Sequence, residues 1–248
     1  MDTATMLMLF LIGVFSSFVG SLVGGGGLIS IPLLNLVGLP LNVAIATDRL
    51  SSIGQASSIY KYHKSNKIIY KNIVLLSVIS LIGAIIGSKI LLSLDKDILV
   101  KTLGVIFIVF LAVLLTKKDI GYKLVKTSKF KKVIGFFLYF LVAIYAGFFG
   151  AGTGILATLV FIFLFGYSYI NSNATYSILW LIIAVFSSIL FAFEGIINYQ
   201  YALVVFVGSV IGGHLGASTA IKKGEKFVRV LFFLLIIVFT IKFLFFSN

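Results

Sequence analysis

The chain has no cysteine, two histidines, two prolines and only seven acidic residues among 248. Without cysteine no disulfide forms, and with two isolated histidines there is no ligand set for thiolate or histidine-rich metal chemistry. A redox or zinc enzyme is therefore not expected, and we predict neither a cofactor nor a metal site.

Charge is absent from long parts of the chain. Residues 3–47 and 133–193 contain no Asp, Glu, Lys, Arg or His, and hydrophobic residues make up 60% of the whole against 11% charged. The mean hydropathy is +1.19. Because about 20 helical residues span the roughly 30 Å hydrocarbon core, each uncharged stretch must cross or enter a membrane more than once. The composition predicts an all-α polytopic membrane protein, and since Asp2 replaces a basic signal region, we expect its apolar start to be mature protein.

Ten apolar segments are separated by short polar or charged connections. They lie at 5–23, 28–38, 41–60, 72–94, 98–116, 133–149, 154–165, 169–193, 199–221 and 227–246. The second and seventh are too short to span a bilayer alone, and each follows a glycine cluster. Broken helices are tolerated at membrane depth only where they are buried in protein or line a cavity. We therefore expect both to be half-helices or re-entrant pieces.

The two halves of the chain resemble each other at an offset of about 127 to 129 residues, which is the pattern of transporter folds with internal repeats. The landmarks that align are Gly20–Gly27 with Gly147–Gly154, Ala46-Thr47 with Ala174-Thr175, and Gly83 and Gly87 with Gly212 and Gly216. We predict a first repeat at 1–118, a basic cytoplasmic linker at 119–131 and a second repeat at 132–248.

Lysines predict how the repeats are oriented. Basic residues fill the connections at 61–71, 117–132 and 222–229, which should be cytoplasmic by the positive-inside rule. Both termini and the connections at 95–97 and 194–200 should lie outside. The two repeats are then inverted, with about five segments each. Because topology explains the net charge of +13, no nucleic-acid partner is expected.

A combination of motifs resembles the sulfite exporter TauE/SafE family of membrane transporters. It consists of the glycine-rich run from Gly20 to Pro32 followed by Ala46-Thr47-Asp48-Arg49-Leu50, with a degenerate second copy. The resemblance covers nearly the whole chain and implies transport of sulfur-containing anions, such as sulfite, sulfonates or sulfoacetate, across the cytoplasmic membrane. The second copy departs from the pattern, with Leu159 in place of Pro32 and Tyr176-Ser177 in place of Asp48-Arg49.

Arg49 is the first candidate for a substrate-binding residue. It lies near the middle of the 41–60 segment, where an Arg in hydrocarbon costs about 2.5–3.5 kcal/mol or more, so it should face a polar cavity or a partner. Its helical neighbours at three and four positions are not acidic. A bound anion would complete the pairing. The alternatives are a salt bridge with Asp48 and contacts with unwound carbonyl groups.

The glycine breaks supply further candidates. A helix that begins after Gly24, Gly25, Gly26 and Gly27, or at Gly152, Thr153 and Gly154, would present free N–H groups and its positive dipole end to an oxyanion. Close helix packing is the alternative, and it is the preferred interpretation for the Gly-x-x-x-Gly pairs at 83–87 and 212–216.

Three polar side chains, those of Thr47, Asn173 and Thr175, could donate hydrogen bonds to the substrate or simply join helices. Asp48 is a candidate for carrying a coupling proton, although an ion pair is its preferred role.

We predict a secondary transporter of a small anion that works by alternating access, with protons or ions as candidate coupling species and the lipid bilayer as its surroundings. An anion channel or an uptake permease for another small anion is the alternative within transport. A membrane scaffold is the alternative outside it. An intramembrane enzyme is not expected, because the charged groups of the apolar segments lie in different repeats.

Overall fold

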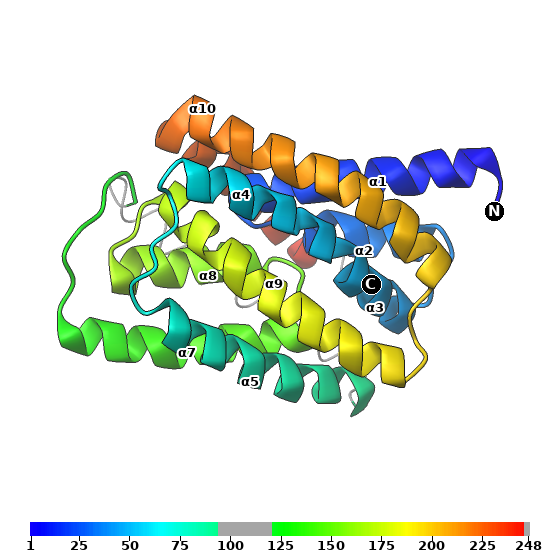
Figure 1. Ribbon diagram of the computed structural model, residues 1–248, viewed down its shortest axis with the longest axis horizontal. Coiled ribbons are helices and arrows are strands. Elements are labelled where there is room, and N and C mark those ends of the chain that lie inside the picture. Colours follow the sequence, from blue (N-terminus) through cyan, green and yellow to red (C-terminus); the bar gives the residue numbers. More distant parts are fainter. Residues whose placement is uncertain (94–120, 246–248) are drawn as a thin grey trace.

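The computed structural model describes residues 1–93 and 121–245, and every regular element in these ranges is a helix (Figure 1). Five of the described helices are long and apolar enough to cross a membrane. The all-α membrane class predicted from composition is confirmed. The predicted segment at 98–116 and the connection at 95–97 lie outside the described residues.

The first half begins with α1 (Thr3–Val23), which starts at Asp2, where the side chain accepts the Thr5 N–H at 3.4 Å. It ends at Gly24, whose φ of 83° is left-handed. The short helix α2 (Gly27–Leu36) follows almost at once, as predicted from the glycine cluster.

The predicted segment 41–60 is helical but not uniform. It consists of α3 (Leu41–Ser51), a 3-10 stretch (Ser52–Ala56) and α4 (Ser57–Lys64). The tightened stretch contains Gly54, where a Cβ would overlap the carbonyl oxygen of Phe206 on a neighbouring helix. The first half continues with α5 (Ile73–Ser93).

The second half opens with α7 (Lys129–Phe148), followed by the short α8 (Thr153–Val160), which runs on into a π-helical turn (Phe161–Phe165). The helix α9 (Tyr169–Phe193) starts at Ser168, where the hydroxyl accepts the Asn171 N–H at 3.2 Å. The two final segments form one element, α10 (Tyr199–Phe245), which bends at Gly224, a residue with non-helical φ and ψ.

Glycines bring the long helices together in two pairs, α1 against α10 and α5 against α7. A Cβ at Gly212 or Gly216 would overlap the backbone of α1, and a Cβ at Gly83 or Gly87 would overlap α7. The predicted packing role of these four glycines is confirmed. The core lies between the pairs, where every residue of α8 is buried.

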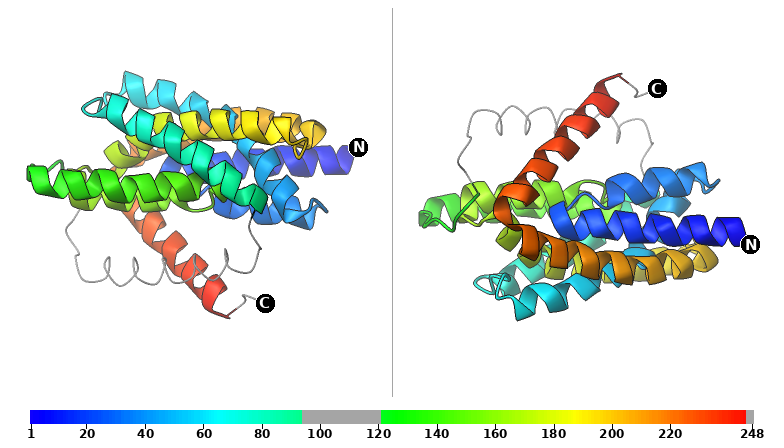
Figure 2. Two further views of the ribbon diagram at one scale, coloured as in Figure 1. Left: turned by 90° about the horizontal axis from the view of Figure 1, so that it is seen from below. Right: turned by 90° about the horizontal axis from the view of Figure 1, so that it is seen from above.

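The first long helices of the two halves, α1 and α7, run in opposite directions. From the N-terminus α1 runs toward the end that holds the connection between α4 and α5, whereas α7 starts at that end (Figures 1 and 2). The short helices α2 and α8 begin near each other and run apart toward opposite ends.

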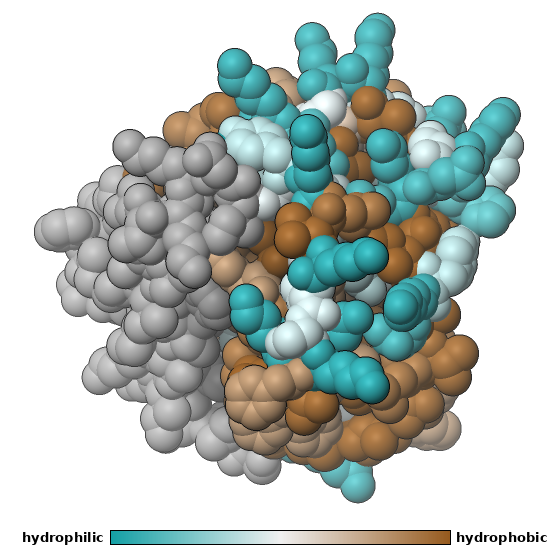
Figure 3. All heavy atoms as spheres, turned by 90° about the vertical axis from the view of Figure 1, so that its left-hand side faces the viewer, coloured by the Kyte–Doolittle hydropathy of each residue, from teal (hydrophilic) through white to brown (hydrophobic). Residues whose placement is uncertain are grey.

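The basic connections gather at one end of the molecule. The turns at 64–72, 121–128 and 222–226 lie there, and hydrophilic side chains crowd this end (Figure 3). The N-terminus and the connection at 194–198 lie at the opposite end. This distribution agrees with the orientation expected from the positive-inside rule.

Candidate substrate cavity between the two glycine breaks

The two glycine breaks meet in the middle of the molecule. A Cβ at Gly24 would overlap the backbone of Gly154, and one at Gly154 would overlap Gly24. Gly27 lies equally near the other break, since its Cβ would be 3.2 Å from the Cα of Ala151. The N-termini of α2 and α8 therefore start side by side, and only glycine permits this approach.

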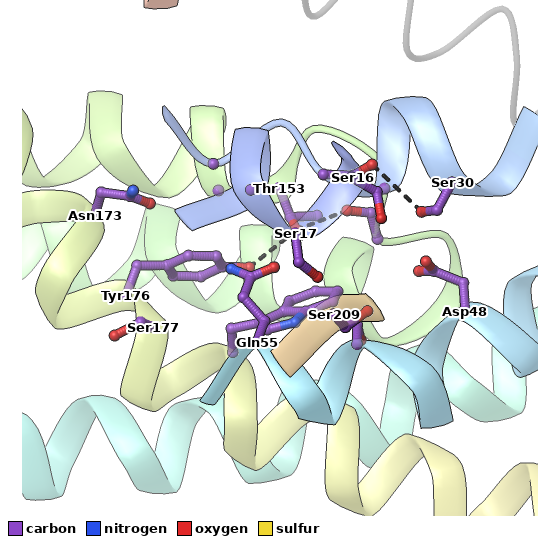
Figure 4. Close-up of a pocket in the computed structure, with 18 residues that line it drawn as sticks. Ser16, Ser17, Ser30, Asp48, Gln55, Thr153, Asn173, Tyr176, Ser177 and Ser209 are labelled. Carbon is purple, nitrogen blue, oxygen red and sulfur yellow. Dashed lines mark hydrogen bonds between the residues drawn. The ribbon is translucent and has the colours of Figure 1, made fainter. Parts of the chain in front are cut away.

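A small polar cavity of about 30 Å³ opens beside the two breaks. In Figure 4, Asp48 and Ser30 lie on one side of it and Tyr176 and Asn173 on the other. The elements α1, α2, α3, α9 and α10 all contribute to its wall. Hydroxyl groups, amides and bare backbone dominate the lining, which consists of Ser16, Ser17, Gly20, Gly24, Gly26, Gly27, Ser30, Asp48, Ser52, Gln55, Gly150, Thr153, Gly154, Asn173, Tyr176, Ser177, Trp180 and Ser209.

Several hydrogen-bond donors around the cavity lack an acceptor. The backbone N–H groups of Gly26 and Gly154 donate to no residue that the structure describes. The indole Nε1 of Trp180 is buried and likewise has no partner among the described residues. Because buried donors are normally paired, the N–H groups of the buried residues Gly154 and Trp180 indicate a ligand that accepts hydrogen bonds. The positive dipole ends of two helices favour an anionic one.

Asp48 is the one charged side chain among the described residues that line the cavity. Its side chain is 3% exposed, and its Oδ2 is buried without a hydrogen-bond partner. No ion pair joins it to Arg49 in the described structure. Successive residues of a helix point about 100° apart, so the two adjacent side chains leave α3 in different directions.

Arg49 lies behind the cavity wall instead of lining it. The side chain is completely buried, Nη2 donates to the carbonyl oxygen of Ala146 at 2.7 Å, and the guanidinium lies 4.7 Å from the centre of the Trp180 ring. Its Nε and Nη1 atoms have no partner among the described residues. Gly150 presses against the guanidinium, because a Cβ there would overlap Nη1 and Nη2. Of the contacts weighed from the sequence, the ion pair with Asp48 is not formed in the described structure; the carbonyl group that Arg49 contacts belongs to the last turn of α7 and not to unwound backbone.

Thr47 and Thr175 bind backbone instead of the cavity. The Thr47 hydroxyl accepts the N–H of Asn198 at 3.1 Å, and the Thr175 hydroxyl accepts the N–H of Ile69 at 3.0 Å. Each bond crosses between the halves and fastens the connection that precedes the next long helix. The interhelical role weighed for these residues is the one that the contacts support.

The cavity brings together part of the predicted set. Its lining includes Asp48, Gly24, Gly26, Gly27, Thr153, Gly154 and Asn173, but not Arg49, Gly25, Thr47, Gly152 or Thr175. Within it, the Tyr176 hydroxyl donates to the Thr153 hydroxyl at 2.9 Å, which donates to the Gly150 carbonyl at 2.8 Å. The Asn173 amide donates to the Ser21 carbonyl.

Sequence reasoning missed several lining residues. Ser16 and Ser17, a polar pair in an otherwise apolar helix, carried a signal that could have marked them. Trp180 carried none, because an aromatic residue in a membrane segment is usually packing or interfacial material.

An all-helical chain with membrane-length helices, two broken short helices and a central polar cavity is a multi-pass membrane transporter by its architecture. The chain belongs to the sulfite exporter TauE/SafE family, whose sequence pattern matches residues 9–243. The resemblance drawn from the glycine-rich and Ala-Thr-Asp-Arg motifs is thereby confirmed.

Curated relatives carry matching descriptions. A "Probable membrane transporter protein" of Haemophilus influenzae is 28% identical over 90% of this chain and 88% of its own length. The "Probable membrane transporter protein YfcA" of Escherichia coli K12 is 24% identical over 97% of this chain and 90% of its own. The "Probable membrane transporter protein ORF9" of Sinorhizobium is 26% identical, over 95% and 91%. No solved structure matches the chain.

Proposed function

We propose that the protein is a secondary transporter of a small oxyanion of the sulfite or sulfonate class, and that the cavity between the glycine breaks is its binding site. The observation that carries this proposal is that two helix N-termini and Trp180, whose indole N–H has no partner among the described residues, meet at one polar cavity. An oxyanion has several acceptor oxygens and no need of a metal, so it satisfies these donors at once.

Arg49 is the proposed source of positive charge for this site. In the described conformation the guanidinium contacts Gly150 and Trp180, and both of these residues line the cavity. Its positive charge therefore lies directly behind the cavity wall. Two of its nitrogens are buried without partners, which leaves capacity for an anion in a conformation where the break at Gly150 shifts. Gly25, Gly152, Thr47 and Thr175 support the site from behind its wall.

The proposed mechanism is alternating access between two inverted repeats, 1–118 and 132–248, which the linker at 119–131 joins. Both termini then lie on the external side of the cytoplasmic membrane. Opposite helix directions and the shared end of the basic connections support it. So do contacts that occur in exchanged pairs. Thr47 of the first repeat accepts a hydrogen bond from Asn198 of the second. At the repeat offset, Thr47 corresponds to Thr175 and Asn198 to Ile69, and Thr175 of the second repeat accepts a hydrogen bond from Ile69 of the first.

The glycine contacts repeat this relation. Gly24 corresponds to Ala151 at the repeat offset, and Gly154 corresponds to Gly27. Gly24 contacts Gly154, and the corresponding residues Ala151 and Gly27 also lie in contact. A two-fold axis through the middle of the molecule, lying in the membrane plane, has this effect. Such an axis would pass near the cavity, where alternating access requires the binding site to be.

Counterflow in liposomes tests the function. Purified protein is reconstituted into vesicles loaded with unlabelled sulfite, and radiolabelled sulfite is added outside. A transporter gives a transient accumulation of label above equilibrium. With the membrane potential held at zero by valinomycin and equal potassium on both sides, an anion channel, the second candidate, would let the label equilibrate without the overshoot. A scaffold would give no flux beyond that of protein-free vesicles.

A further inference from the structure

Asp48 is the charged group that the cavity leaves unexplained. Its carboxylate faces a space with donors for an anion, its Oδ2 is unpartnered, and the side chain is 3% exposed. A buried carboxylate oxygen without a donor is costly, so it calls for a proton, a cation or a ligand that donates a hydrogen bond. We propose that the cavity binds its oxyanion together with one proton, which Asp48 carries, so that anion and proton cross the membrane as a pair. This inference rests on the proposed function.

Among the residues that the structure describes, few charges near Asp48 could compete for this role. On its own helix, Arg49 donates to the Ala146 carbonyl and makes no ion pair with Asp48, although its positive charge acts on Asp48 at a distance. From α9, Tyr176 is the other titratable side chain of the lining, and from α7, Tyr145 interacts with Arg49 and does not line the cavity. The lining residues from α1, α2, α8, α10 and the 3-10 stretch are glycine, serine, threonine or glutamine.

Charge balance explains why the proton should arrive with the anion. In the empty cavity, Arg49 and the two helix N-termini offset the negative charge of Asp48. An anion adds a second negative charge within the same small, water-poor space, where like charges repel strongly. Protonation of Asp48 removes that repulsion and converts its carboxylate into an O–H donor. Asp48 then joins the Trp180 N–H and the free backbone N–H groups as a donor to the oxyanion.

A bound sodium ion is the competing explanation for a buried carboxylate among hydroxyl groups. Two helix N-termini at the same cavity oppose a cation there. The geometry thus favours a proton, and the experiment below includes sodium as an outcome.

Calorimetric titration of the purified full-length protein with sulfite, in buffers of different ionisation enthalpy, counts the protons taken up on binding. Sulfite itself titrates, so the comparison is between wild type and Asp48→Asn, whose amide resembles a protonated carboxyl group. We expect wild type to take up about one more proton than Asp48→Asn. The ratio of the wild-type Kd to that of Asp48→Asn should rise up to about tenfold per pH unit across the titration of Asp48. Glu194→Gln, the same chemical change on an exposed side chain, should behave as wild type.

Equal proton uptake by wild type and Asp48→Asn would overturn the inference and leave the proposed function standing. So would a sodium dependence of sulfite affinity that Asp48→Asn abolishes, since the carboxylate would then serve a cation. If Asp48→Asn does not fold, the wild-type measurement is decisive. A proton uptake on binding that is no greater than the ionisation of sulfite accounts for then refutes the role of Asp48. If wild type neither binds sulfite nor gives counterflow, it is the proposed function that fails.

Discussion

Alanine in place of Gly150 would put a methyl group into the guanidinium of Arg49. The φ of Gly150 is +78°, a conformation that costs an L residue about 1–2 kcal/mol. Overpacking adds about 1–3 kcal/mol. If Arg49 gives way, its charged hydrogen bond to Ala146, at 2.7 Å and of a kind typically worth about 1.5–3 kcal/mol, is also lost. Gly150→Ala should therefore destabilise the protein, displace Arg49 from Trp180 and suppress sulfite counterflow.

The chain contains a matched control. Gly195 has a φ of +67°, but no atom lies within 4 Å of the position that a Cβ would take there, so Gly195→Ala carries only the backbone cost. Trp180 is the sole tryptophan of the chain, and its fluorescence reports directly on the position of Arg49. Thermal unfolding in detergent and the emission of Trp180 are measured for both variants. If Gly150→Ala loses no more stability than Gly195→Ala and keeps the wild-type emission maximum of Trp180, the placement of Arg49 behind Gly150 is refuted.

Three other perturbations test the same geometry. Arg49→Gln should weaken sulfite binding about tenfold to a hundredfold, the effect of losing about 1.5–3 kcal/mol, while Arg49→Lys keeps the charge and part of the function; full counterflow by Arg49→Gln would remove Arg49 from the site. Single cysteines introduced at Lys64 and Glu194 should react with an impermeant thiol reagent from opposite sides of the membrane, and labelling from the same side would contradict the inverted repeats. Thr47→Val and Thr175→Val should each lower stability by about 0.5–1.5 kcal/mol without a change in sulfite affinity, as thermal unfolding and calorimetry would show, because each hydroxyl holds a backbone N–H outside the cavity.

Local composition was enough to predict the membrane class and most helix positions. Bilayer-length apolar runs and glycine clusters act through the chain itself, so α9 was predicted over its full length, 169–193. The short helices after the glycine clusters and the packing of Gly83 and Gly87 could be predicted for the same reason. The 3-10 stretch within the apolar segment at 41–60 could not be predicted in this way. A neighbouring helix approaches Gly54 closely there, and no local pattern encodes that contact.

The direction of each buried side chain depended on tertiary structure. The sequence predicted that Arg49 would face a polar cavity or a partner. In the structure it lies behind the cavity wall, and its neighbours there come from α7 and α9, some hundred residues away in the chain. The recruitment of Trp180 and Ser209 to the cavity has the same origin. Sequence alone therefore determined that the chain is a broken-helix membrane protein of this family, whereas the packing of one half against the other decided which polar groups face the cavity, because a side chain in a buried helix points to whatever its neighbours leave open.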